Sequence, residues 1–356
     1  MSVCIPTYNG ADYLEDCLRS ALAQTYANVE VLVVDDCSSD DTLRIAQAHA
    51  HRDPRVQVLR NPKNLGLVGN WNRCVELARG EWVKFLFQDD LLHPQCVEKL
   101  VAEGQDQGRQ LVACDRDFLF DGTIDADYRA AYERNRAAIR ARLAPARGAS
   151  AAEFAALLAT SPRHNHLGEP TVTLIHRRAF AEHGLFNPDL AQICDLEFWA
   201  RVGGQHGVAY VPETLATFRA HGGATSAANR RDRSYRASGL DPLRMVSAML
   251  RSPAYATLRQ HWQRVGQLDQ MQAHERELAY RASAYARRHP RAPSDGRTVA
   301  EEYALFVAQH PQCGVTLVAH WLWQARGLPG RVRYRVGQWL NPLLPADWRR
   351  DKALPF

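Results

Sequence analysis

The stretch Trp82-Val-Lys-Phe-Leu-Phe-Gln-Asp-Asp90 joins a run of strand-forming residues to two adjacent carboxylates, and a turn follows at Leu91-Leu-His-Pro94. This pattern predicts a buried strand that meets solvent at Asp89 and Asp90. Like charges side by side repel each other, and no cation stands next to them in the sequence to neutralise them. Carboxylate oxygens are ligands that Mg²⁺ and Mn²⁺ prefer, so the pair is a candidate metal site. A solvated turn at a strand end is the plainer alternative.

Strand and helix signals alternate over about the first 115 residues with short links, which is typical of a parallel sheet covered by helices. The run Val29-Glu-Val-Leu-Val-Val34 is nearly all apolar, as in a strand buried on both faces. Ser38 and the acidic residues after it resemble a helix cap and first turn, for a helix running to about His51. We expect further strands over 3–6, 56–59, 82–87, 111–114, 172–176 and 208–211, and further helices over 11–24, 67–78, 178–183 and 195–202.

Two regions are expected. A mixed, mainly parallel α/β domain covers residues 1–225, with a charged helical excursion over 118–150 at the edge of the sheet. After about residue 225 no strand signal is convincing, and residues 226–356 read as a basic, mainly helical region. Residues 228–356 contain 21 Arg and Lys against 10 Asp and Glu. This excess favours an anionic partner, such as a membrane surface, although the chain is Arg-rich throughout.

The C-terminal region holds one further pattern. Arg331-Val-Arg-Tyr-Arg-Val-Gly-Gln-Trp-Leu340 suits an amphipathic helix. Such a helix could lie in a membrane interface or pack its apolar face on the preceding α/β domain, and both alternatives stay open.

Composition indicates an ordinary globular protein, with 46% hydrophobic and 23% charged residues. Eight cysteines are scattered singly, without a CxxC pair, and are expected to be reduced. The chain opens on a strand signal rather than a secretory signal, and no apolar stretch approaches the ~20 residues that span a bilayer. We therefore expect a cytoplasmic protein, with contact to the inner face of the cytoplasmic membrane left open, and no nucleic-acid partner.

Polar residues follow three of the expected strands. The first strand ends at Pro6-Thr-Tyr-Asn9, the second at Asp35-Asp36 and the fourth at Gln88-Asp89-Asp90. In open α/β sheets ligands bind at the carboxyl ends of the strands, so these side chains should converge on one crevice. Tyr8 could stack on a nucleobase and Asp36 could accept its hydrogen bonds, while the carboxylate pair could hold a cation that neutralises a diphosphate.

Taken in order, these pieces resemble the inverting family 2 glycosyltransferases of the GT-A fold, of the bacterial surface-polysaccharide type. The resemblance covers about residues 2–225, and no Walker or dinucleotide-type glycine loop is present. The matching text is Val3-Cys-Ile-Pro-Thr-Tyr-Asn-Gly10, Val33-Val-Asp-Asp-Cys-Ser-Ser-Asp-Asp-Thr42, Asn64-Leu-Gly66, Phe85-Leu-Phe-Gln-Asp-Asp90, Asp195-Leu-Glu-Phe-Trp-Ala-Arg201 and Phe218-Arg-Ala-His221.

The resemblance implies roles for these residues. Asp90 would be the principal ligand of Mn²⁺ or Mg²⁺, with Asp89 near the ribose or the metal and His221 as a further metal or diphosphate ligand. The donor nucleotide-sugar would be bound by Pro6, Thr7, Tyr8, Asn9, Asp35, Asp36, Asn64, Gly66, Asn72 and Asp89.

Asp195 falls where the family has its general base, which takes the proton of the attacking acceptor hydroxyl. Helix capping is its alternative role, and Glu197 is an alternative base that lies on a different helical face. His166, Glu169 and Trp199 are candidates for acceptor contact, although a polar loop and a core aromatic explain them equally well.

The chain departs from the family pattern at two places. The family often has Asp-x-Asp-Asp at the metal site, whereas Phe87 and Gln88 precede Asp89 here. Many relatives have an Arg-Asn pair near the donor, whereas this chain has Trp71-Asn72. Both departures put the strength of metal and diphosphate binding in doubt.

The function implied is transfer of a hexosyl or deoxyhexosyl group, with inversion, from a nucleoside-diphosphate sugar (UDP or dTDP favoured) to a saccharide or lipid-linked acceptor. Cell-surface polysaccharide biosynthesis is the expected setting. A sugar nucleotidyltransferase is one alternative, but no glycine- and basic-rich triphosphate loop lies between Pro6 and Tyr13. A catalytically inactive sugar-nucleotide-binding or scaffold protein is the other.

Overall fold

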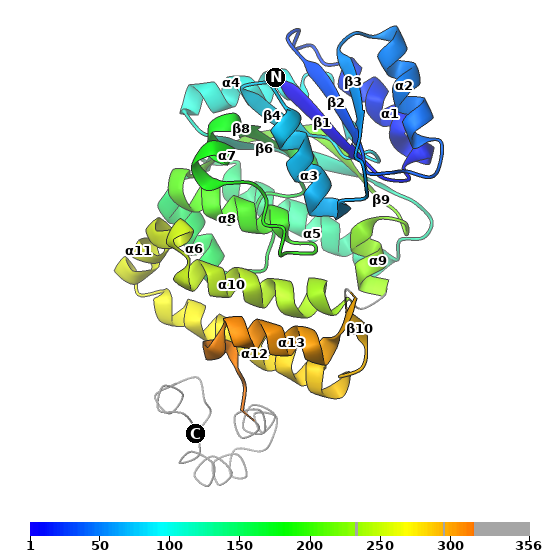
Figure 1. The fold of residues 1–356 in the computed structure, drawn as a ribbon. Coiled ribbons are helices and arrows are strands. Elements are labelled where there is room, and N and C mark those ends of the chain that lie inside the picture. Colours follow the sequence, from blue (N-terminus) through cyan, green and yellow to red (C-terminus); the bar gives the residue numbers. More distant parts are fainter. Residues whose placement is uncertain (232–233, 295, 317–356) are drawn as a thin grey trace.

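The computed structural model describes residues 1–231, 234–294 and 296–316. Its central sheet has the strand order β3-β2-β1-β4-β8-β6-β9-β5, with β7 paired to β9 (Figure 1). The strands are β1 (Ser2–Thr7), β2 (Glu30–Asp35), β3 (Val56–Arg60), β4 (Trp82–Phe85), β5 (Leu91–Leu92), β6 (Leu111–Phe120), β7 (Gly148–Ala149), β8 (Thr173–His176) and β9 (Val208–Ala220).

Strand direction decides which residues meet at the edge of the sheet. β1 runs parallel to β2 and β4, and β6 runs parallel to β9, whereas β8 is antiparallel to β4 and β6. The carboxyl ends of β1, β2, β4 and β9 therefore share one edge with the amino end of β8. The prediction of a mixed, mainly parallel α/β sheet is confirmed.

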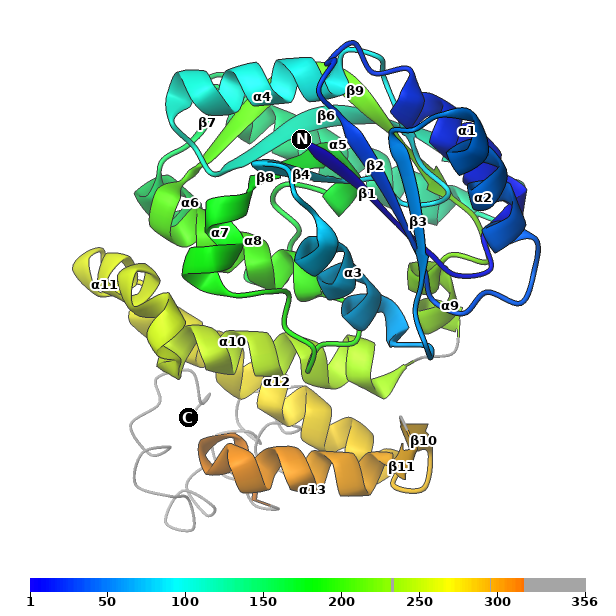
Figure 2. The ribbon, with the colours of Figure 1, turned by 45° about the horizontal axis from the view of Figure 1, so that its top comes forward.

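Helices cover both faces of the sheet. Val3, Ile5, Val31 and Val33 point into one core with α1, α2 and α4, while Cys4 and the residues of alternating register point into a second core with α3, α6 and α8 (Figure 2). This alternation is what a strand buried on both faces requires. The helices are α1 (Ala11–Leu22), α2 (Thr42–Arg52), α3 (Gly66–Leu77), α4 (Cys96–Gln107), α5 (Ala126–Leu143), α6 (Ala151–Thr160), α7 (Arg177–His183) and α8 (Cys194–His206).

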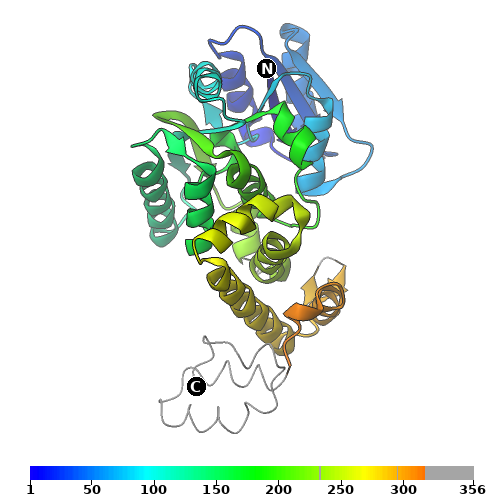
Figure 3. The same ribbon diagram turned by 90° about the vertical axis from the view of Figure 1, so that its left-hand side faces the viewer.

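The chain after residue 225 is mainly helical as far as it is described. The second core continues without interruption into these helices through Met245, Trp262 and Tyr280, and Figure 3 shows them layered beside the sheet domain. They are α9 (Thr225–Arg231), α10 (Asp241–Arg251), α11 (Ala256–Arg264), α12 (Leu268–Arg288) and α13 (Val299–Gln309), with a small hairpin of β10 (Pro293–Ser294) and β11 (Arg297–Thr298). The division at residue 225 stays a prediction, and the helix expected over 331–340 lies outside the described residues.

Two features differ from the sequence-based expectation. β6 and β9 run to Phe120 and Ala220, far beyond the short apolar runs that predicted them. The apolar pattern did not indicate their second halves because these carry polar residues, such as Asp115, Arg116 and Asp117 in β6. α2 begins at Thr42 rather than near Ser38. Ser38 instead accepts a hydrogen bond from the backbone N–H of Asn9 (2.9 Å), which binds the loop after β2 to the loop after β1.

The remaining predictions concern cysteines and membrane spans. All eight cysteines are free thiols, and all but Cys37 are buried. Within the described parts of the chain, no helix combines the length and the apolar character that crossing a bilayer demands.

Candidate active site

The turn after β4 is held by a residue of the short turn before β8 and by a residue of β9. The backbone N–H of Arg219 donates to Asp90 Oδ1 (2.8 Å), and its Nε donates to the carbonyl oxygen of Asp89 (2.9 Å). The hydroxyl of Thr171 donates to Asp90 Oδ2. Asp90 is fully buried, and this burial, followed by the charge of Asp89, raises the pKa of Asp90 well above its usual range. The prediction that the chain meets solvent at Asp90 is therefore wrong, and Asp90 instead ties the turn to the rest of the sheet.

Asp89 is the more accessible carboxylate of the pair. Its Oδ2 lies 2.9 Å from Nε2 of His221, and the two side chains keep 19% and 12% of their exposure. The His221 ring packs on Tyr13, with 4.8 Å between ring centroids. One carboxylate oxygen and one imidazole nitrogen, close together at this edge, are ligand types that suit a divalent cation such as Mn²⁺.

Gln88 joins the ends of β1 and β4. Its Oε1 accepts from the backbone N–H of Tyr8 (2.9 Å), and its Nε2 donates to the carbonyl oxygen of Tyr8 (3.1 Å). A Cβ at Gly10 would lie 2.2 Å from this amide, so the position requires glycine. The Tyr8 ring itself remains 51% exposed at the edge of the sheet, as a base-stacking role requires.

Asp36 organises the loop before α3. Its carboxylate accepts hydrogen bonds from Nδ2 of Asn61 (2.8 Å) and from the backbone N–H groups of Leu65 (2.8 Å) and Gly66 (3.0 Å). Asn64 donates to the carbonyl oxygen of Asp36 (3.1 Å). The φ of Gly66 is +74°, in the left-handed region that favours glycine. Asp36, Asn64 and Gly66 thus lie together at the predicted nucleotide side.

The other predicted donor residues lie at this edge with mixed accessibility. Pro6 and Thr7 are buried in β1, and Asp35 is fully buried with Oδ2 near Ser38 N (3.1 Å) and Arg60 Nε (3.5 Å). Asn9 is exposed, and its Oδ1 accepts from the backbone N–H of Ser39 (2.8 Å). These contacts shape the loops around Tyr8.

Asp195 lies in the first turn of α8. Nδ2 of Asn165 approaches its Oδ2 to 3.5 Å, which is a long contact for a hydrogen bond. Burial raises the pKa of Asp195 to about 7, against two backbone N–H groups that lower it. The N-cap position belongs to Ile193, so the capping alternative for Asp195 is not the one that this helix uses.

Glu169 connects this carboxylate to the metal side. Its Oε2 pairs with Nε of the buried Arg116 (2.7 Å), and its charge contributes to the raised pKa of both Asp90 and Asp195. Thr171, which holds Asp90, follows only two residues later. The carboxylates of Asp90, Glu169 and Asp195 therefore belong to one electrostatic neighbourhood.

Three predicted or alternative site residues are committed elsewhere. Trp199 is fully buried and donates from Nε1 to the carbonyl oxygen of Gly168 (3.2 Å), so the prediction that it stacks on an acceptor sugar is wrong. Asn72 uses its amide on both backbone groups of Phe186 (2.9 and 3.0 Å), which draws it away from the diphosphate. Glu197 pairs with Arg201 (2.8 Å) and accepts from the hydroxyl of Tyr255.

His166 does not face an open acceptor site either. It is 3% exposed, and its ring nitrogens lie 3.0 Å from the carbonyl oxygen of Ser161 and 3.3 Å from Nη1 of Arg142. Burial and the charge of His164 lower its pKa to about 4, so the ring is neutral. His166 supports the loop rather than binding sugar hydroxyls.

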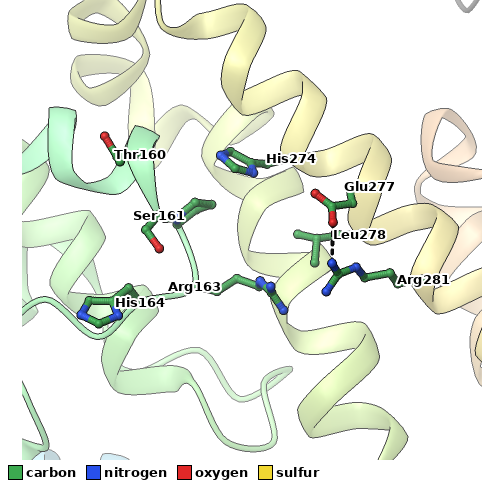
Figure 4. A pocket seen from close by; sticks show the side chains of 9 residues that line it. Thr160, Ser161, Arg163, His164, His274, Glu277, Leu278 and Arg281 are labelled. Carbon is green, nitrogen blue, oxygen red and sulfur yellow. Dashed lines mark hydrogen bonds and ion pairs between the residues drawn. The ribbon is translucent and has the colours of Figure 1, made fainter. Parts of the chain in front are cut away.

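The same loop lines a cavity of about 350 Å³ against α12. Figure 4 shows Arg163 and His164 on one side, facing His274 and the Glu277–Arg281 pair on the other. Asn165, the next residue along, contacts Asp195. The loop thus reaches from the active-site edge to the C-terminal helices.

Comparison with known proteins begins with the sequence. The family model of "Glycosyl transferase family 2" matches residues 2–182. The chain is 43% identical over 103 residues to chondroitin synthase of Escherichia coli, a match that covers 29% of this chain and only 15% of that protein.

Two solved structures share the fold. TarS of S. aureus in complex with UDP-GlcNAc has a TM-score of 0.54 at 14% identity, covering 88% of this chain and 92% of that one. The mannosyltransferase PcManGT of Pyrobaculum calidifontis in complex with GDP-Man and Mn²⁺ has a TM-score of 0.52 at 18% identity, covering 95% and 84%. These likenesses confirm the GT-A fold.

Proposed function

The chain belongs to glycosyl transferase family 2, and on that premise we propose that it moves one sugar from a nucleoside-diphosphate sugar to a saccharide or lipid-linked acceptor, with inversion at the anomeric carbon. One observation carries this proposal. The Asp89–His221 pair follows β4, and Glu169 influences both the neighbouring Asp90 and the desolvated carboxyl of Asp195, which supports a single site.

Asp89 and His221 would hold Mn²⁺ or Mg²⁺, with Asp89 in the role that the sequence assigned to Asp90. The bound cation would neutralise the charge that develops on the departing diphosphate. Asp90, whose two oxygens already accept hydrogen bonds from Arg219 and Thr171, would fix the turn that carries Asp89. The metal assignment therefore rests on one carboxylate and one imidazole.

Asp195 would be the general base. As the acceptor hydroxyl oxygen forms its bond to the anomeric carbon, the hydroxyl proton would pass to the Asp195 carboxylate, and the bond to the diphosphate oxygen would break on the opposite face. A base whose pKa is about 7 is well matched to this step at neutral pH. Of the three acceptor candidates, Glu169 alone would keep a place beside the reacting groups.

The donor base and the setting are part of the proposal. Tyr8 would stack on the base, and UDP or dTDP is favoured, although the neighbour that binds GDP-Man makes guanine a necessary comparison. Likeness to chondroitin synthase supports a role in polysaccharide synthesis. Contact with the inner face of the membrane through the C-terminal region remains part of the hypothesis.

The test is a matrix of donors and metals. UDP-, dTDP- and GDP-sugars would each be mixed with the protein with and without Mn²⁺, and thermal shift would identify the pair that stabilises the folded state most. Transfer from that donor to saccharide acceptors would then be followed by NMR, which reports the anomeric configuration of the product. We expect a metal-dependent shift with one base and an inverted product.

Different results would favour the alternatives. Release of pyrophosphate from a nucleoside triphosphate and a sugar phosphate would indicate a nucleotidyltransferase. Donor binding without transfer to any acceptor, and without slow donor hydrolysis, would indicate an inactive sugar-nucleotide-binding protein. A product with retained configuration would overturn the single-displacement mechanism.

A further inference from the structure

Two helices end at a group of metal-ligating side chains that the proposed reaction does not use. Glu182 and His183 close α7, and His206 closes α8, and Figure 1 shows these helices as neighbours. At a rise of 1.5 Å per residue, His206 lies about 17 Å along α8 from Asp195. The group is therefore separate from the candidate active site.

The ligand atoms form a compact triangle. Nε2 of His183 and Nε2 of His206 lie 2.9 Å apart, and Oε2 of Glu182 lies 3.5 Å from Nε2 of His206 and 3.9 Å from Nε2 of His183. Zinc–ligand bonds of about 2.0–2.1 Å at tetrahedral angles place neighbouring ligand atoms about 3.3 Å apart. The three edges bracket that value, so only small movements of the side chains would be needed.

The surroundings hold the group in a fixed geometry. Burial, followed by the charge of the neighbouring His206, lowers the pKa of His183. Nη1 of Arg201 donates to the carbonyl oxygen of His183, and Nη1 of Arg109 donates to that of His206. These contacts anchor the backbone of both histidines.

Charges around the group act in both directions. The carboxyl ends of α7 and α8 carry partial negative charge, which favours a cation between them. Arg178, whose Nε lies 3.9 Å from Glu182 Oε1, and the two arginines on the carbonyls oppose it. Opposing arginines weaken binding without blocking the triangle, because they contact the far oxygen of Glu182 and the backbone.

Gln110 supplies an additional sign of an incomplete site. Its Nε2 donates to Glu182 Oε2 (3.0 Å), while its buried Oε1 finds no hydrogen-bond partner among the described residues. The two amide orientations of glutamine are nearly equivalent in shape. If the Gln110 amide turned over, its oxygen instead of its N–H group would point toward Glu182 and could contact a cation held there.

We propose that Glu182, His183 and His206 form a binding site for a divalent transition-metal ion, with Zn²⁺ the best fit, which fastens the end of α7 to the end of α8. Two imidazoles and one carboxylate suit Zn²⁺ better than Mg²⁺ or Ca²⁺, and water would fill the fourth position. A plain hydrogen bond between the two imidazoles accounts for the 2.9 Å contact alone, but it does not require the carboxylate.

The experiment uses the full chain, freed of metal by chelation, with Asp89→Asn to remove the other metal site. Titration with ZnCl₂ by calorimetry should give one site. Adding His206→Gln should weaken binding by about 100-fold or more, as expected when a directly bound ligand is lost. Co²⁺ bound in place of Zn²⁺ should show the intense visible absorption of a tetrahedral site.

Matched controls separate specific binding at this triangle from general binding of Zn²⁺ to surface histidines and carboxylates. Glu15→Gln disrupts a different His–carboxylate pair, Glu15–His49 at 2.9 Å, and should leave Zn²⁺ binding unchanged. Where His206→Gln lowers the metal-free Tm, the exposed Glu182→Gln provides the second variant. The proposal is overturned if the Asp89→Asn protein takes up no Zn²⁺, or if both cluster variants bind it as tightly as their parent.

Discussion

The turn after β4 and the first turn of α8 each contain two carboxylates. In each region one carboxylate is held by several neighbouring groups, and we call it committed, while the other has fewer such contacts, and we call it open. Asp90 is tied down by Thr171 and Arg219, and Glu197 by Arg201 and Tyr255. The open residues differ in the side chains that lie next to them. Asp89 faces an imidazole at 2.9 Å, whereas the side chain that approaches Asp195 is a neutral amide at a long distance.

This difference in company separates two chemical roles. A carboxylate and a ring nitrogen that lie side by side at the edge of the sheet can bind one cation together. A carboxyl that burial desolvates has its pKa raised to about 7 and can take up a proton in the reaction. In the proposed function, the groups around each carboxylate, rather than the residue type, would set its role.

The largest effect is expected at Asp195. Asp195→Asn keeps the shape of the side chain but removes its basicity, so turnover should fall by roughly 10²–10⁴-fold, the contribution of a general base. Metal-dependent donor binding, measured by calorimetry, should stay within about twofold of the parent protein. Undiminished turnover would contradict the base assignment and remove the proposed difference in chemical role between the two regions.

Asp89→Asn should have the next largest effect. The amide is a weaker cation ligand, so Mn²⁺-dependent donor binding and turnover should both fall, by about 10²-fold if the metal contributes several kcal/mol. Donor titrations with and without Mn²⁺ measure this directly. His221→Gln should reproduce the loss, and a variant with normal metal dependence would remove Asp89 from the site.

The pH dependence of kcat/KM tests the proposed role of Asp195 alone. Because the base must be ionised, kcat/KM should fall about tenfold per pH unit below an apparent pKa of about 7. The same raised pKa lowers stability as pH increases from the usual value of 3.8 to about 7, since the folded state holds the proton more tightly than the unfolded state. A profile flat from pH 5 to 8 in single-turnover assays would argue against this base.

Asp90→Asn should affect stability more than metal binding. Its amide oxygen can still accept from the Arg219 backbone N–H, but its N–H group would then face Thr171, whose hydroxyl would have to turn from donor to acceptor, and a buried hydrogen bond that is lost in this way costs about 1–3 kcal/mol. Urea unfolding of Asp90→Asn beside Thr171→Val, which removes one of the two donors, measures this cost. If Asp90→Asn instead abolishes Mn²⁺ binding while remaining as stable as the parent, Asp90 is the ligand that the sequence first indicated.

The order of motifs along the chain was enough to predict the sheet and the open residues Asp89, Asp195 and His221. The hydrogen-bond partners of Asp90 could not be predicted, because Thr171 and Arg219 lie 81 and 129 residues away from it in the sequence. The antiparallel course of β8, which brings Thr171 to this edge, has no local signal. Helical spacing also could not tell that Trp199 faces the core, since its Nε1 partner, Gly168, lies in a distant loop.

Phe87 and Trp71, the two positions at which this chain departs from its family, lie against each other. Their rings stack with centroids 4.8 Å apart and planes inclined by 29°. A carboxylate restored at position 87 alone would face an indole, and an arginine restored at 71 alone would face a phenyl ring. We therefore expect the effects of substitutions at positions 71 and 87 to be coupled, so that changing both together differs from the sum of the two single changes.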